Sequence, residues 1–238
     1  MIPILISIAI LAFCWGVYWT HASPYSQFFG RFPYRAKSAE KQIALTFDDG
    51  PNGEFTSALL DILKTQSVPA TFFVVGKAVA VHPDLAKQIV QDGHVIGNHS
   101  YDHVFLNYLK APRFEEQIQS TQEIIKKTTD KKPALFRPPW LYRQPALFST
   151  LKRLHLQPVS GVFCHPFEVG QISAERIARA AVRRARPGGI LIFHDGHDGH
   201  DGNRQQTIEA VRLTIEQLKR QGYKFTTVDK LLAVPAYL

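Results

Sequence analysis

Short apolar runs alternate with amphipathic runs along the chain from residue 42 onward. This alternation is typical of β-strands and α-helices that follow one another in an α/β domain. Helices that stop at a glycine are predicted over Pro83–Asp92 and Gln205–Gln221. The predicted strands are Ile43–Phe47, Thr71–Val75, His94–Gly97, Ala134–Arg137, Gln157–Phe163, Ile190–Phe193 and Lys224–Val228. About seven strands with helices between them predict an α/β fold of the distorted (β/α) barrel kind.

The N-terminal apolar run is longer than any of these. Residues 2–19 are almost continuously apolar, and the first thirty residues contain no Asp, Glu, Lys or Arg. This run is close to the ~20 residues that span a bilayer, so we expect it to contact a membrane. We predict that residues 1–22 form a hydrophobic anchor helix or a signal peptide, residues 23–39 a linker and residues 40–238 the folded domain. Thr20-His21-Ala22 resembles a cleavage site, but no basic residue precedes the run, so both interpretations stay open.

Composition narrows the class of protein. Of the 238 residues, 45% are apolar and 20% are charged, which indicates a folded chain. The two cysteines, Cys14 and Cys164, argue against a disulfide framework and exclude a cysteine-rich metal site. The net charge of +8 favours anionic surroundings. The arginines within residues 176–186 fall on an Ala-rich helical stretch, which we interpret as a solvated helix face, and we expect no nucleic-acid partner.

Polar side chains follow several of the predicted strands. They are Asp48 and Asp49 after the first strand, His99 and His103 after the third, Arg137 at the end of the fourth and His194 after the sixth. In a barrel of parallel strands the loops at the carboxyl ends form the active site. One rim of the barrel is therefore predicted to carry all these side chains.

The residue types on this rim indicate a metal site. His99 and His103 are four residues apart, a spacing that would place both imidazoles on one face of a helical turn. With Asp49 they would form a two-histidine, one-carboxylate site, which holds Zn²⁺ and leaves a position open for water. Two surface histidines and an Asp in an Asx turn are the alternative interpretation. His194, at a strand end, could act as an acid or base near neutral pH.

Two aromatic residues and two histidines near this rim can each be interpreted as structural or as functional. Trp140 and Tyr142 would be core aromatics in most proteins, but on this rim they could present a flat apolar surface to a sugar ring. His197 and His200 repeat a His-Asp-Gly unit in a glycine-rich loop. We interpret these two histidines as solvated, with weak adventitious metal binding as the alternative.

Four motifs, taken together in this order, resemble those of the polysaccharide deacetylases of carbohydrate esterase family 4, the NodB-homology domain. They are Thr46-Phe47-Asp48-Asp49-Gly50, His99-Ser100-Tyr101-Asp102-His103, Arg137-Pro138-Pro139-Trp140 and Leu191-Ile192-Phe193-His194. The resemblance covers about residues 40–232, so residues 40–238 are expected to be the catalytic domain. It also implies a distorted barrel with fewer than eight strands.

The resemblance implies a role for each residue on the metal side of the site. Asp49, His99 and His103 would hold a divalent metal, most often Zn²⁺. Asp48 would be the base that takes a proton from the metal-bound water, whose pKa the ion lowers. Arg137 would orient Asp48 and balance its charge.

The remaining roles concern the leaving group and the substrate. The resemblance implies that His194 protonates the leaving amine and that the backbone N–H of Trp140 helps to hold the oxyanion. Tyr142, Phe167 and Leu191 are expected to contact the substrate.

One family motif is altered in this chain. An Asp-Trp pair that supports the catalytic acid and lines the acetate pocket usually stands between the third and last motifs. Here Pro166 stands where the Asp is expected, and Phe167 could replace the Trp as an apolar wall. Without that carboxylate, His194 would lose the partner that raises its pKa and fixes its tautomer. We hypothesise that Glu168 or His165 takes over this role.

The resemblance predicts a metal-dependent hydrolase that removes N-acetyl groups from N-acetylglucosamine units of a polysaccharide, with peptidoglycan ahead of chitin-like polymers. The alternatives are an O-deacetylase that uses the same residues and a catalytically silent, membrane-tethered carbohydrate-binding module. We expect a monomer that is membrane-anchored or secreted, with an extracytoplasmic catalytic domain. The positive charges at positions 31, 35, 37 and 41 argue instead for a cytoplasmic domain. The substrate class outweighs that charge count.

Overall fold

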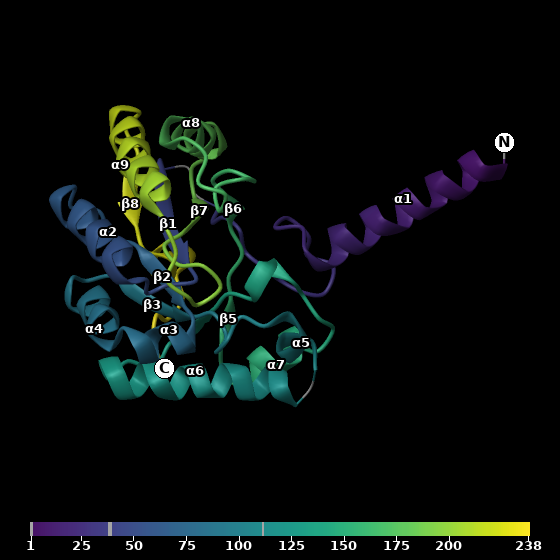
Figure 1. The fold of residues 1–238 in the computed structure, drawn as a ribbon, viewed down its shortest axis with the longest axis horizontal. Helices are drawn as coiled ribbons and strands as arrows, with labels where there is room; N and C mark the ends of the chain where they lie inside the picture. The colour runs from purple at the N-terminus through teal and green to yellow at the C-terminus, as the bar shows by residue number, and fades with distance from the viewer. Residues whose placement is uncertain (1, 38–39, 111) are drawn as a thin grey trace.

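The computed structural model describes residues 2–37, 40–110 and 112–238 as an α/β domain from which one helix projects (Figure 1). Residues 1, 38–39 and 111, which fall in the predicted anchor, linker and domain, lie outside the described residues. The strands are β1 (Gln42–Asp48), β2 (Thr71–Val74), β3 (Val95–Asn98), β4 (Leu135–Phe136), β5 (Gln157–Pro158), β6 (Val162–Phe163), β7 (Gly189–His194) and β8 (Lys224–Thr226). The helices are α1 (Ile2–His21), α2 (Gly53–Thr65), α3 (Gly76–Val81), α4 (Pro83–Gln91), α5 (Phe105–Leu109), α6 (Arg113–Thr129), the 3₁₀ turn η1 (Pro139–Leu141), α7 (Leu147–Arg153), α8 (Ala174–Arg184), α9 (Gln205–Arg220) and α10 (Val228–Leu232).

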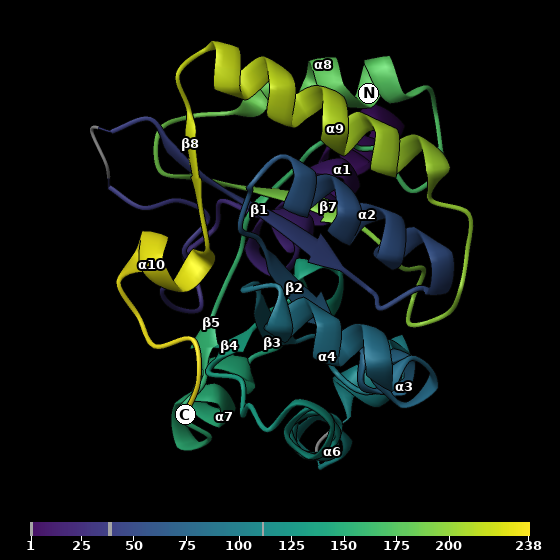
Figure 2. The ribbon, with the colours of Figure 1, turned by 90° about the vertical axis from the view of Figure 1, so that its left-hand side faces the viewer.

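The strands form one parallel, curled sheet in the order β5-β4-β3-β2-β1-β7-β6, with β8 also paired to β1. Helices surround the strands on the outside, as Figure 2 shows for α2, α4, α6, α8 and α9. The predicted distorted barrel is confirmed. The predicted glycine stops are confirmed as well, because Gly93 and Gly222 follow α4 and α9 with φ of 82° and 81°.

Two predicted strands differ from the structure. The strand predicted over Gln157–Phe163 is two strands, β5 and β6, which pair with opposite ends of the sheet and so bridge its two edges. The carbonyls of Val159 and Ser160 between them accept hydrogen bonds from a buried arginine rather than from a neighbouring strand. The strand predicted over Lys224–Val228 ends at Thr226, because β8 pairs only with the first half of β1 and β2 pairs with the second half.

Side-chain alternation along β1 separates the core from the site. Ile43, Leu45 and Phe47 are fully buried in the hydrophobic core that also includes residues of α2, α8 and α9. Thr46 and Asp48 point to the other face, into the barrel interior, because successive side chains of a strand face opposite sides. The same rule places His194 of β7 beside Asp48, its register partner on β1.

The segment predicted as a linker packs against the domain as far as it is described. Phe32 is fully buried and packs with Leu141 and Ile192. Ala36 donates a backbone hydrogen bond to Gly188, and Arg35 forms an isolated bridge with Gly189 at the start of β7. Residues Phe32, Arg35 and Ala36 of this segment therefore contact the domain directly.

Candidate active site

Arg137 lies in the centre of the barrel and holds Asp48. The Arg137 side chain is fully buried, and its Nη1 donates to Asp48 Oδ1 at 2.6 Å and to Thr46 Oγ1 at 2.7 Å. Its Nη2 donates to the carbonyl of Ser160 at 3.0 Å, and its guanidinium lies 4.1 Å from the ring centroid of Phe73. These contacts orient one carboxylate oxygen of Asp48 toward the arginine, which is the arrangement that the resemblance implies.

Asp49, His99 and His103 come together at the carboxyl ends of β1 and β3. The Nε2 atoms of His99 and His103 lie 3.4 and 3.3 Å from Asp49 Oδ1. All three side chains are buried, and one ligand atom of each lies within 4.8 Å of the others. Burial raises the pKa of the Asp49 carboxyl, but His99, His103 and His194 together outweigh that effect and lower it.

The two histidines do not share a helical turn, which differs from the sequence prediction. Residues 99–104 form a loop that precedes α5, with Ser100 and His103 at positive φ of 67° and 55°. The loop turns both rings toward Asp49. The four-residue spacing is therefore compatible with the site for a different geometric reason than helical periodicity.

The outer nitrogen of His99 has a hydrogen-bond partner, and that of His103 lies at ion-pair distance from a carboxylate. His99 Nδ1 lies 2.7 Å from the carbonyl oxygen of Arg137, and this contact requires Nδ1–H as the donor. In the neutral ring this tautomer leaves Nε2 unprotonated and able to bind a metal. His103 Nδ1 lies 3.0 Å from Asp198 Oδ1. Such outer contacts orient metal-binding imidazoles, so the donor set fits a divalent cation held by Asp49, His99 and His103.

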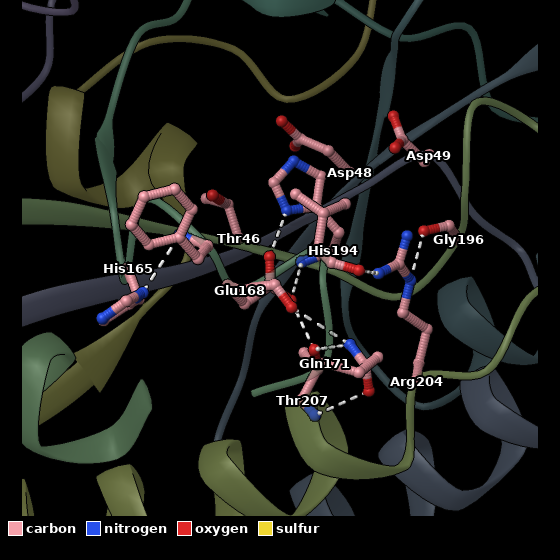
Figure 3. A network of polar contacts seen from close by, with 12 residues as sticks. Thr46, Asp48, Asp49, His165, Glu168, Gln171, His194, Gly196, Arg204 and Thr207 are labelled. Carbon is pink, nitrogen blue, oxygen red and sulfur yellow. Dashed lines mark hydrogen bonds and ion pairs between the residues drawn. The ribbon is translucent and has the colours of Figure 1, made fainter. Parts of the chain in front are cut away.

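Glu168 lies directly against His194 (Figure 3). Its Oε2 is 2.6 Å from His194 Nδ1, and only 1% of the Glu168 residue surface is exposed. Thr207 donates its hydroxyl hydrogen bond to Glu168 Oε1, and Gln171 Nε2 donates to the Thr207 hydroxyl at 2.9 Å. The carboxylate is thus held from the β6–α8 loop and from the first turn of α9. His165 was the other residue considered for this position, but its Nδ1 accepts a hydrogen bond from the backbone N–H of Phe167 at 3.0 Å.

Charge around His194 favours its protonated form. Burial alone would lower the pKa of this imidazole, but the adjacent Glu168 carboxylate raises it to about 9. The pKa of Glu168 is lowered by the same contact despite the opposing effect of burial. The pair therefore carries both charges at neutral pH.

A cavity of about 390 Å³ connects these groups. It is lined by the polar residues Asp48, Asp49, His99, His103, His165, His194, His197 and Asp198 and by Trp140, Leu141, Phe163, Pro166 and Val169. Trp140 reaches it with a backbone φ of 55° and packs its ring 4.3 Å from that of His103. A polar floor and an apolar wall in one cavity suit a sugar that carries an acetamide group.

Three residues expected to contact the substrate lie elsewhere. Leu191 is buried among residues of the helical layer, because strand alternation turns Ile190, Ile192 and His194 of β7 the other way. Phe167 is 68% exposed and does not line the cavity. Tyr142 does not line it either and stacks on His21 at a ring-centroid distance of 5.3 Å. Leu141, Phe163 and Val169 take their places in the wall.

The structure also brings in residues that we do not predict from the sequence. Asp198 belongs to the glycine-rich loop, where a two-residue turn between His197 and His200 points it at His103. Arg204 is buried and ties that loop to the β6–α8 loop, donating to the carbonyls of Gly196 and Val169. No local spacing marks these residues, because His103 and Val169, the partners that define their positions, are far away in the sequence.

Comparison with known proteins identifies the family. The family model described as polysaccharide deacetylase matches residues 35–159, more than half of the chain. The chain belongs to the polysaccharide deacetylase family. The match includes the Asp48-Asp49, His99–His103 and Arg137 motifs, and the resemblance to carbohydrate esterase family 4 is confirmed.

Two relatives within this family have names that describe a substrate. A peptidoglycan-N-acetylglucosamine deacetylase of Bacillus cereus is 37% identical over 204 residues, which are 85% of this chain and 93% of the relative. The peptidoglycan-N-acetylmuramic acid deacetylase PdaA of Bacillus subtilis is 33% identical over 204 residues, 84% of this chain and 74% of the relative. Relatives of this deacetylase thus act on either amino sugar of peptidoglycan.

Solved structures share the fold. The peptidoglycan N-acetylglucosamine deacetylase Bc1960 superposes with a TM-score of 0.81 at 29% identity, covering 86% of this chain and 94% of that one. A pseudoenzyme of carbohydrate esterase family 4 from Bacillus anthracis, BA3943, superposes with a TM-score of 0.75 at 27% identity, covering 84% and 68%. The fold alone therefore does not separate active members from inactive ones, and the residues in the cavity have to do so.

Proposed function

We propose that this deacetylase removes N-acetyl groups from N-acetylglucosamine units of peptidoglycan in a metal-dependent reaction that releases acetate. The observation that supports it is the convergence of Asp48, the Asp49-His99-His103 cluster and His194 in one cavity. A silent binding module would need neither a base nor an acid at these positions. We further propose that α1 keeps the catalytic domain at the outer face of the membrane, where the wall polymer is.

Asp49, His99 and His103 would hold the cation, most readily Zn²⁺ given a two-histidine, one-carboxylate donor set. When bound, a cation of this kind lowers the pKa of a water and polarises a carbonyl. Asp48 accepts the proton of the attacking water. Arg137 orients the Asp48 carboxylate and balances its charge through the 2.6 Å contact of its Nη1 with Oδ1.

The leaving group is an amine, which needs a proton before it departs. Since Glu168 occupies Nδ1 of His194, the Nε2 atom remains to donate that proton. The backbone N–H of Trp140 would stabilise the oxyanion. Trp140, Leu141 and Phe163, which line the cavity, would form the wall for the sugar and the acetyl methyl group. In this scheme Glu168 replaces the carboxylate that the altered motif lacks.

The test is acetate release from N-acetylglucosamine oligomers and from peptidoglycan by the full chain in detergent. We expect release that stops on chelation, returns with Zn²⁺ and is reduced about 10³-fold or more in Asp48→Asn. Asp84→Asn, which changes an exposed aspartate on α4, is the matched control and should behave as the wild type. Mass analysis of digested peptidoglycan should place the free amine on glucosamine. A free amine on muramic acid, or the loss of O-acetyl groups, would mean that the enzyme acts on a different substrate. Sugar binding without acetate release would identify a silent module.

A further inference from the structure

Helix α1 reaches the catalytic domain without a spacer. Its 20 residues are about 30 Å long, which matches the hydrocarbon thickness of a bilayer. The window Ile4–His21 has a mean hydropathy of 1.7, and none of it is buried. Trp15, Tyr18 and Trp19 lie in its last two turns, where aromatic side chains mark the headgroup level of spanning helices. A bilayer around α1 would therefore end where the domain begins (Figure 1).

A buried arginine of the domain caps α1. The Arg143 side chain is fully buried, and its Nε and Nη2 donate to the carbonyl of Thr20 at 3.2 and 3.0 Å. Its Nη2 also donates to Trp19 at 3.4 Å, and its Nη1 donates to Leu141 at 3.2 Å. The last carbonyls of a helix have no partner within the helix, so these bonds satisfy groups that would otherwise be open. Most of the acceptors around this buried charge therefore belong to α1.

The last residue of α1, His21, makes two hydrogen bonds with the backbone of Arg143. The backbone N–H of Arg143 donates to the carbonyl of His21 at 2.7 Å, and His21 Nδ1 lies 2.8 Å from the carbonyl oxygen of Arg143. The His21 ring stacks on Tyr142. The end of the helix is thus fixed to the loop that follows η1.

Ring contacts continue from this loop into the active site. Tyr142 lies 5.4 Å from Phe105, Phe105 lies 5.2 Å from Trp140, and Trp140 lies 4.3 Å from the metal-site residue His103, all measured between ring centroids. Trp140 also has a left-handed backbone, a conformation that its surroundings must hold in place. The end of α1 is therefore part of the support of the cavity wall.

We propose that α1 is retained in the mature protein as a membrane-spanning anchor and that its last turn is a structural part of the active-site rim, held there by Arg143. The bilayer is the partner of α1, and the cavity would work on glycan next to the membrane surface. Cleavage between Ala22 and Ser23 would remove the Thr20 and Trp19 acceptors of Arg143 and create a charged terminus at Ser23, which is only 1% exposed. The substrate part of this proposal rests on the proposed function, but the retention of α1 does not.

Retention is tested by intact mass and N-terminal sequencing of the native chain purified from membranes. We expect a protein that still contains residues 2–21. A mature chain that begins at Ser23 would overturn the proposal. This readout needs no activity, so it separates a failure of this proposal from a failure of the proposed deacetylase function.

The coupling to the rim is tested with Arg143→Gln and His21→Ala in the full chain in detergent, with acetate release from N-acetylglucosamine oligomers as the assay. For Arg143→Gln we expect KM to rise about tenfold while kcat changes less than threefold and zinc content is unchanged, because the wall moves but Asp48 and His194 do not. A simple loss of folded protein would lower kcat at constant KM. His21→Ala should raise KM about threefold, and it decides the question if Arg143→Gln does not fold.

Arg153→Gln is the matched control, because Arg153 is exposed and pairs with Glu115 on the domain surface. Its KM should stay within twofold of the wild type. Folded Arg143→Gln and His21→Ala proteins with wild-type KM would show that α1 is a mere tether and would overturn the coupling.

Discussion

The two sides of the cavity are built in different ways. On the metal side, Asp48, Asp49, His99, His103 and Arg137 come from the ends of β1, β3 and β4, and each belongs to a short motif. On the acid side, His194 ends β7, but its partner Glu168 comes from an irregular loop. Thr207 and Arg204, in or beside the first turn of α9, hold that loop.

This difference shows which active-site residues must stand at fixed positions in the sequence. The cation needs three donors at ligand distance, so its residues are tied to strand ends that the barrel places side by side. The acid needs only a negative charge near Nδ1 of His194. Glu168 can supply that charge from two positions beyond Pro166, because the loop is free to turn it inward.

The strongest way to break the metal side is to remove one ligand. In His99→Ala we expect zinc content to fall from about one ion per chain to below a tenth and acetate release to fall at least about 10³-fold, because two ligands do not hold the ion that activates water. His155→Ala, at an exposed position, should keep both. Full activity in zinc-free His99→Ala would contradict the assignment of the metal site.

The acid side is tested by Glu168→Gln, which keeps the shape of the side chain and removes its charge. Because Glu168 raises the pKa of His194 to about 9, the wild type should keep a protonated acid up to about pH 9. In the variant this pKa falls toward the ordinary value for His, about 6.5, so the alkaline limb of the kcat profile should move to lower pH. We also expect kcat at pH 7 to fall about tenfold.

Glu175→Gln, an exposed change at the start of α8, is the control for that pH profile. Zinc content should be the same in both variants, which separates an effect on the acid from one on the metal. An alkaline limb in Glu168→Gln that coincides with that of the wild type would exclude Glu168 as the partner of His194.

A smaller effect is expected from Asp198, which contacts His103 from outside the ligand cluster. Asp198→Asn should weaken zinc affinity about tenfold, since outer contacts of this kind contribute 10- to 100-fold and this carboxylate is partly exposed. Zinc competition with a chelator measures the change. Asp201→Asn is the control: Asp201 lies in the same loop, but it pairs with His82 and not with a metal-site histidine. The zinc affinity of this variant should equal that of the wild type.

The smallest effects compare two phenylalanines on the acid side. Phe167→Ala should change KM for N-acetylglucosamine oligomers less than twofold, because this ring is exposed and outside the cavity. Phe163→Ala should raise KM about tenfold, because its ring lines the cavity and stacks on His194 at a centroid distance of 6.1 Å. The reverse order would mean that the loop changes its conformation when the substrate binds.

The sequence alone is sufficient for the barrel and for the metal-side cluster. Strands and helices are visible in it because burial of one face imposes a period on apolar residues, and the strand-end motifs follow because parallel strands share a carboxyl edge. The division of Gln157–Phe163 into β5 and β6 is not visible in the sequence. Val159 and Ser160 fit the strand pattern, but in the folded protein their carbonyls accept hydrogen bonds from Arg137. Leu191 was expected to contact the substrate but lies in the hydrophobic core. A motif shows which residues are neighbours in the sequence, but it does not show which face of β7 each one occupies.

The tertiary structure alone decided which residue accompanies His194 and what the end of α1 contacts. The sequence leaves Glu168 and His165 as equal candidates, and only the packing of the loop against α9 brings one carboxylate to 2.6 Å. The apolar run likewise shows that α1 could cross a membrane, but Arg143 reaches its last turn from more than 120 residues away. Local periodicity and motifs specify elements and their ends, whereas contacts between distant loops depend on how the whole chain closes around them.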